Sequence, residues 1–196
     1  MGVVAPLSAV GASVVPVAAG LIAGERPSLV TWAGILCALP AIWLVSTAAD
    51  RAAESEMRGR FGDGVMDGLL AGLGFGVLFA ALGQVPDSAG LGPVVAAEAF
   101  AILAVIVLAA LFRQSWIPRD TSSLPAIAVG ALAAGATVLF LLASQAGLLT
   151  VAAVLSSLYP AFTVLLAATI LREPIRRIQA LGLVLATVAV VLVAIG

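Results

Sequence analysis

The run from Thr121 to Leu171 contains no charged side chain of either sign. A helix that crosses the hydrocarbon core of a bilayer needs about 20 apolar residues, each rising about 1.5 Å. The run is therefore too long for one crossing and has the right length for two. Its polar dip at Ser144, Gln145 and Gly147 marks the turn, which predicts helices over 124–144 and 149–171.

Charged clusters cut the rest of the chain into further stretches of spanning length. The predicted helices cover 3–23, 29–47, 64–84, 91–112 and 178–195. The composition agrees, since 63% of the residues are hydrophobic and 10% are charged, whereas soluble domains are about 45–50% apolar and about 25% charged. The sequence thus predicts an all-α integral membrane protein with about seven transmembrane helices.

The residue types exclude several classes of function. All nine cationic residues are arginines without a basic stripe, so we expect no nucleic-acid partner. There is no histidine, and Cys37 is the only cysteine, so neither a metal site nor a disulfide is predicted. No nucleophile stands near a general base, so we expect no enzyme activity and no cofactor. The partners that remain are the lipid bilayer and a small-molecule solute.

The chain matches itself at a shift of 148 positions, which is the distance from Glu25 to Glu173. The pairs that agree in this register include Val3–Val151, Ser8–Ser156, Glu25–Glu173, Gly34–Gly182, Leu44–Leu192 and Val45–Val193. The first two helices therefore look like copies of the last two. Five crossings separate the copies, so they run in opposite directions, as in the inverted repeats of secondary transporters.

This register divides the chain into three parts. Residues 1–47 form the last two helices of a first repeat, 48–63 form a polar linker, and 64–196 form a complete second repeat of five helices. The pairing of halves predicts about 85 further residues, or three helices of about 20 residues with their loops, ahead of Met1. The alternative is a family that functions with seven helices.

Several segments resemble EamA-type carriers of the drug/metabolite transporter superfamily. Val3–Ala9 with Gly24–Pro27 looks like the fourth helix of that family, and Val151–Thr163 resembles its ninth. Leu171–Pro174 with Gln179 and Gly182 is similar to its loop into the tenth helix, and Ala71–Gly76 is similar to its sixth. The resemblance implies the remnant of a ten-helix inverted-repeat (5+5) transporter in the inner membrane of a bacterium.

The predicted function is the transport of a small metabolite, amino acid or drug by a secondary carrier. The alternative is a truncated, non-transporting membrane protein that acts as a structural or interaction partner, and a homodimer is left open. Arginines concentrate in the second, fourth and sixth loops, which predicts that these loops are cytoplasmic and that the C-terminus lies outside. The resemblance instead implies that both termini are cytoplasmic.

Glu98 is the outstanding candidate for function, because it lies about 10 Å along the helix axis from Leu91. A carboxylate at such depth costs roughly 2.5–3.5 kcal/mol on insertion scales, so we expect it to face the bundle or water. Its functional interpretation is a proton or cation site coupled to transport. The alternatives are an acid near enough to the interface to stay wet, or the partner of an arginine that this chain lacks.

The other candidates for the substrate path carry hydrogen-bonding groups. They are Gln84, Gln145, Tyr159 and Ser156. Each has a structural alternative, because glutamines at helix ends are satisfied by water and hydroxyls in helices bond to their own backbone or to a neighbouring helix. Pro16 and Pro160 are candidate helix bends that free backbone carbonyls near the midplane. Glu25 and Glu173 are predicted to be equivalent loop anchors, with gating as the functional alternative.

Overall fold

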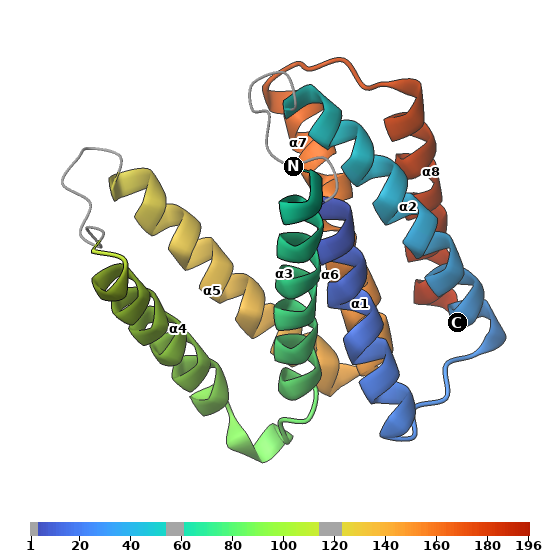
Figure 1. Cartoon of the computed structure of the whole chain (residues 1–196). Coiled ribbons are helices and arrows are strands. Elements are labelled where there is room, and N and C mark those ends of the chain that lie inside the picture. Colours follow the sequence, from blue (N-terminus) through green and yellow to red (C-terminus); the bar gives the residue numbers. More distant parts are fainter. Residues whose placement is uncertain (1–3, 54–60, 114–122) are drawn as a thin grey trace.

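The computed structural model describes residues 4–53, 61–113 and 123–196, and these residues fold into helices joined by short turns (Figure 1). The elements are α1 (Val4–Ile22), α2 (Leu29–Ala53), α3 (Phe61–Leu82), η1 (Asp87–Ala89), α4 (Gly92–Leu111), α5 (Ser123–Ala146), α6 (Leu149–Ser157), α7 (Tyr159–Ile170) and α8 (Arg177–Ile195). No strand occurs in these described ranges.

The prediction of about seven apolar crossings is confirmed. Six stretches are long and apolar enough to span a bilayer, and α6 and α7 together make one of them, Leu149–Ile170. The seventh crossing is α1, whose apolar stretch Leu7–Ile22 is shorter. The chain is therefore an all-α, multi-pass membrane protein.

Helix runs into the predicted polar linker 48–63 from both ends. Helix α2 continues to Ala53, and α3 begins at Phe61. Alanine has the highest helix propensity, and Ala48, Ala49 and Ala52 extend α2 past the charged pair at 50–51. A helix needs no apolar side chains once it has left the hydrocarbon, so charge marks the end of the span rather than the end of the helix. The rest of the linker, 54–60, lies outside the described residues.

Two helical hairpins cross at the centre of the molecule. One is α1 with α2, and the other is the α6–α7 pair with α8. Helix α1 packs against α6, while α2 packs along α8, and in Figure 1 the members of each pair run in opposite directions. The central apolar core lies between the hairpins and includes Ala38, Ile42, Val154 and Ala189.

The contacts between α2 and α8 are reciprocal under the 148-residue shift. A Cβ on Gly34 would lie 2.7 Å from Val193, and a Cβ on Gly182 would lie 2.6 Å from Val45. Gly34 and Gly182 are equivalent in this register, and so are Val45 and Val193. Gly34 touches Val193, and their equivalents Gly182 and Val45 touch each other in the same way. Reciprocal contacts of this kind are what a two-fold axis produces.

Glycine also brings α3 close to α1. A Cβ on Gly72 would lie 2.9 Å from the carbonyl oxygen of Leu7, and a Cβ on Gly11 would lie 2.9 Å from the Cα of Gly72. Small residues at such positions let helix backbones approach closely, which is how helices associate where lipid removes the hydrophobic driving force. Helix α3 is thereby fixed to the first hairpin.

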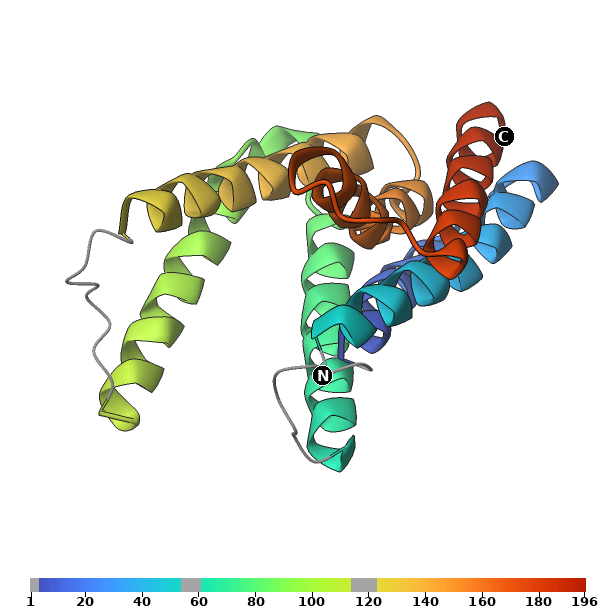
Figure 2. The ribbon, with the colours of Figure 1, turned by 90° about the horizontal axis from the view of Figure 1, so that it is seen from above.

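Helices α4 and α5 form an arm that stands apart from the crossed hairpins, as Figures 1 and 2 both show. In the span Gly92–Leu111, 6% of the residues are buried, and in Pro125–Ala146, 11% are. The C-terminal end of α5 joins the central bundle, where Phe140 and Leu141 pack with Leu82 and Leu149. Val94 near the start of α4 belongs to the same cluster, and most of the other described side chains of the arm are exposed.

The connections between helices fall on two sides of the molecule. The α1–α2, α3–α4 and α5–α6 turns lie together at the bottom of Figure 1, and Arg26 is the only arginine in them. We call this the Arg-poor side. The opposite side, which holds the α7–α8 connection and the start of α1, is the Arg-rich side.

Candidate functional site

The predicted helix 149–171 is broken in the middle, where α6 ends at Ser157 and α7 begins at Tyr159. At the break, the Leu158 N–H bonds to the carbonyl of Leu155 at 3.2 Å, and the Ala161 N–H bonds to the carbonyl of Leu158 at 2.9 Å. Proline has no N–H, so Pro160 gives the carbonyl of Ser156 no helical donor four residues on. The backbone N–H groups at the end of α6 bond instead to the carbonyls of Leu155 and Ser156, so the break closes with a tighter turn.

Pro16 acts similarly within α1 but does not interrupt it. Helix α1 runs unbroken from Val4 to Ile22, and Pro16 is buried within it. The carbonyl of Ala12 loses its donor four residues on for the same reason. The two proline candidates thus differ in geometry, with a break at one and a continuous helix at the other.

A cavity of about 310 Å³ lies between these two helices and α3. Its lining residues are Ser8, Ala12, Phe75, Phe79, Ser156, Ser157 and Tyr159. Ser8 and Ser156 are equivalent in the repeat register, and Ala12 and Ser156 each stand four residues before a proline. The cavity is therefore at the crossing of equivalent helices.

The lining of this central cavity is mostly apolar, with a few hydrogen-bonding groups and no charged side chain. One wall is aromatic, and Phe79 is held by stacking on Phe140 at a ring-centroid distance of 4.2 Å. The hydroxyl of Ser157 donates to the carbonyl of Ala153 at 2.8 Å and is engaged. Tyr159 is 47% exposed and lines the cavity from the first turn of α7.

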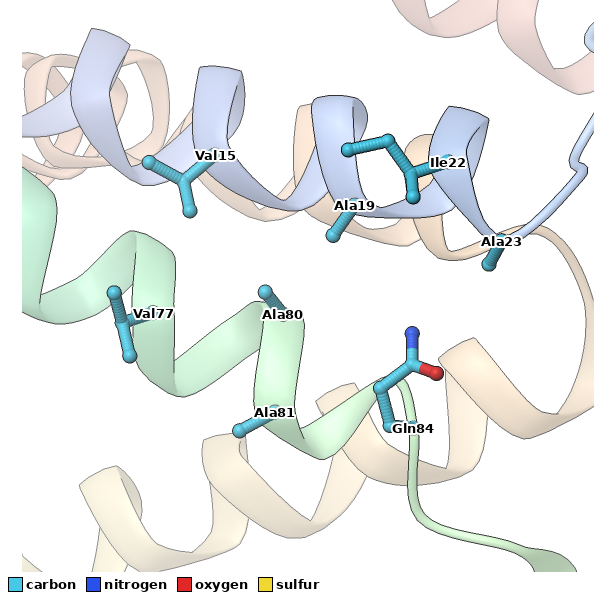
Figure 3. A pocket seen from close by; sticks show the side chains of 8 residues that line it. All are labelled: Val15, Ala19, Ile22, Ala23, Val77, Ala80, Ala81 and Gln84. Carbon is cyan, nitrogen blue, oxygen red and sulfur yellow. The ribbon is translucent and has the colours of Figure 1, made fainter.

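Gln84 lies elsewhere, in an open groove between α1 and α3 (Figure 3). The groove measures about 490 Å³. Gln84 is its only polar side chain among Val15, Ala19, Ile22, Ala23, Val77, Ala80 and Ala81. The other predicted glutamine, Gln145, donates from Nε2 to the carbonyl of Val85 at 3.4 Å, which ties the end of α5 to the turn after α3. Neither glutamine belongs to the central cavity.

Glu98 also lies outside the central cavity, on α4. It accepts a hydrogen bond from the hydroxyl of Thr137 in α5 at 3.2 Å. The same hydroxyl lies 3.1 Å from the carbonyl of Ala133. Neither α4 nor α5 contains another charged residue, so this contact is a polar link between the two helices of the arm.

The loop glutamates are placed differently from each other. Glu25 accepts three hydrogen bonds at the start of α6, from Leu149 N at 2.5 Å, Thr150 N at 3.0 Å and Thr150 Oγ1 at 2.5 Å. Glu173 is exposed and borders a depression of about 190 Å³ beside Gln179 and Pro174. Only the first of the two thus joins separate helices among the described residues.

The structure brings together two of the predicted path residues, Ser156 and Tyr159, and separates the others. Sequence reasoning did not single out Phe75, Phe79 or Ser8 as cavity residues. The signal for Ser8 was available, because it matches Ser156 in the repeat register. The phenylalanines carried no such signal, since an aromatic residue in an apolar span is ordinary.

Crossed hairpins around a broken helix and a small central cavity define a polytopic membrane protein built like a carrier. A comparison with protein-family models matches residues 63–195 to the EamA-like transporter family. The match covers more than half of the chain, so the chain belongs to the EamA-like transporter family. A search of curated proteins found no match, and neither did a search of solved structures.

Proposed function

We propose that this chain carries a small amphipathic solute, uncharged or cationic, through the cavity at the crossing of α1 and the α6–α7 pair. The observation that supports this most is the meeting of Ser8 and Ser156 in one cavity beside the helix break. Binding near the midplane, at the interface of inverted repeats and next to a discontinuous helix, is the common arrangement in secondary transporters.

The chemistry of the lining selects the class of solute. Hydroxyl oxygens accept hydrogen bonds, and aromatic faces attract cations. No arginine lines the cavity to bind a carboxylate or phosphate as a main contact. A volume of about 310 Å³ is at the small end of ligand sites, which run from roughly 300 to 1,000 Å³. Small aromatic amines, amino acids recognised through their ammonium group, and amine drugs fit this description.

Transport would proceed by rocking of one repeat against the other around this cavity. In this proposal residues 1–47 belong to the first repeat, 48–63 link the repeats, and 64–196 make up the second. The membrane is the inner membrane of a bacterium. Coupling to a proton or cation through Glu98 would act by changing how α4 sits on α5, since Glu98 lies outside the cavity.

The test is uptake into liposomes that contain the purified full-length chain. Aromatic amines should accumulate faster than in protein-free liposomes, and an aromatic carboxylic acid of similar size should not. Replacing Tyr159 by Phe removes one hydroxyl and should lower the uptake of a hydrogen-bonding amine by about three- to tenfold, the equivalent of one net hydrogen bond. The matched control is Thr169→Val, which lies farther along α7, outside the cavity, and bonds only to its own helix.

Glu98→Gln tests the coupling separately. If Glu98 carries the coupled proton, this variant should transport without dependence on a pH gradient. Gradient-dependent uptake that survives the substitution would remove Glu98 from the mechanism. Absence of uptake for every amine, from a folded protein, would favour the second candidate function, a non-transporting partner protein that associates with another copy or chain.

A further inference from the structure

The turn between α1 and α2 places Glu25 against the first residues of α6. The first backbone N–H groups of a helix have no partner within the helix, and its N-terminus favours negative charge. Glu25 satisfies two of these groups, those of Leu149 and Thr150, and also accepts the Thr150 hydroxyl. One carboxylate thereby joins parts of the chain that are 124 and 125 positions apart in the sequence.

This contact connects the two hairpins on the Arg-poor side. Helix α1 ends there and α6 begins there, so the carboxylate holds the ends of two crossed helices together. The fold keeps space for it, since a Cβ on Gly20 would overlap both the Glu25 carboxylate and the Thr150 hydroxyl. A side chain at position 20 would therefore displace the contact.

Glu173 occupies the equivalent position on the Arg-rich side, after α7. Its backbone N–H bonds to the carbonyl of Ala167 at 3.3 Å, whereas that of Glu25 bonds to Gly20 at 2.9 Å, so the two turns differ by one residue in the repeat register. Within the part of the chain that the structure describes, its carboxylate makes no hydrogen bond like those of Glu25.

We propose that Glu25 is a positioning residue that closes the solute path on the Arg-poor side by pinning α6 to the α1–α2 turn. The described structure is then the state in which the Arg-poor side is closed. The inference rests on the proposed function for its purpose, but the latch can be tested without any solute.

The experiment places a single cysteine in the cavity by Ser8→Cys, with Cys37→Ser as background. Labelling by a membrane-impermeant maleimide is then measured from each side, in right-side-out and inverted vesicles. Glu25→Ala removes charge-assisted hydrogen bonds, so labelling from the Arg-poor side should rise by on the order of tenfold, while labelling from the Arg-rich side falls. Glu173→Ala is the matched control and should leave the sidedness unchanged, because this carboxylate makes no such hydrogen bonds in the described residues.

Two further variants guard against loss of structure. Thr150→Val keeps the shape of the side chain and removes one of the three bonds, so it should shift labelling in the same direction by about two- to threefold. Arg26→Ala changes the neighbouring exposed charge and should leave the sidedness unchanged. Equal increases from both sides in Glu25→Ala would show general loosening and would overturn the proposal, as would unchanged labelling in both Glu25→Ala and Thr150→Val.

The outcomes separate this inference from the proposed function. A shift in sidedness without uptake of any amine would support the latch and count against transport. Uptake of amines with unchanged sidedness in Glu25→Ala would support transport and overturn the latch.

Discussion

The crossed hairpins and the α4–α5 arm are built from similarly apolar helices but pack very differently. The span Gly92–Leu111 in the arm has a mean hydropathy of 2.7 and 6% of its residues buried. The span Leu29–Ser46 in the hairpins has a mean hydropathy of 2.0 and 44% buried. The more apolar helix is thus the less buried one. In a bilayer, hydrophobicity takes a helix into the membrane, and small residues decide which helices then pack together.

The largest expected effect comes from filling the close contacts that glycines make between α2 and α8. Gly182→Leu should destabilise the folded protein by about 1–3 kcal/mol or more, because its Cβ would meet the backbone of Val45, which cannot move aside. Gly34→Leu should behave alike, because its Cβ would meet Val193 and the carbonyl of Ala189. Thermal unfolding in detergent measures the change.

The matched control for the glycine variants lies in the arm. Gly130 and Gly135 are both in α5, and a Cβ at either position would meet nothing within 4 Å. Leucine there should change stability by no more than about 0.5 kcal/mol. Comparable losses in the arm and in the hairpins would show that both regions are packed, contrary to the comparison.

A smaller effect is expected where the arm is held together by a polar link. Glu98→Leu removes the bond to Thr137 and should weaken the α4–α5 pairing by about 0.6 kcal/mol, up to about 1.7. The distance between spin labels on the two helices should then broaden toward longer values. Glu98→Gln keeps an acceptor for Thr137 and should keep the distance. If both variants leave the distance unchanged, the link is not what holds the arm.

The smallest expected effect is in the hairpin core, at Ser46. Its hydroxyl oxygen is buried with no hydrogen-bond partner in the described part of the chain. Ser46→Ala should therefore leave stability unchanged or raise it by up to about 1 kcal/mol, because an unsatisfied hydroxyl is removed. Thr187→Ala on α8 is the control, since its exposed hydroxyl bonds the carbonyl of Leu183. A clear loss of stability in Ser46→Ala would mean that this hydroxyl has a partner.

The number of crossings could be predicted because spanning length and charge are written directly in the sequence. The crossing of the hairpins was only partly predictable. The register that pairs Gly34 with Gly182 indicated equivalent helices, but which glycine meets which valine depends on the packing of α2 on α8. The break at Leu158 has a clear sequence cause in Pro160, yet Pro16 leaves α1 continuous. A proline removes a donor wherever it lies, and the surrounding packing decides whether the helix parts.

The candidate site could be predicted less well than the fold. Ser156 and Tyr159 lie in the central cavity, while Glu98, Gln84 and Gln145 do not. The sequence shows that a polar group in a span is costly, but it does not show which way that group faces. Glu98 faces Thr137 on α5, and the sequence gives no sign of this partner because α5 contains no charged residue.

The packing of α2 on α8 has a consequence for how the protein is made. Helix α2 precedes α8 in the chain and therefore leaves the ribosome before it. The surface of α2 around Gly34 is therefore exposed to lipid while five other helices are synthesised. It forms a narrow furrow that no side chain fills. During that interval any passing helix with a bulky ridge is a competitor for the furrow. The insertion of α8 thus completes the packing of α2, and correct pairing of these two helices depends on it.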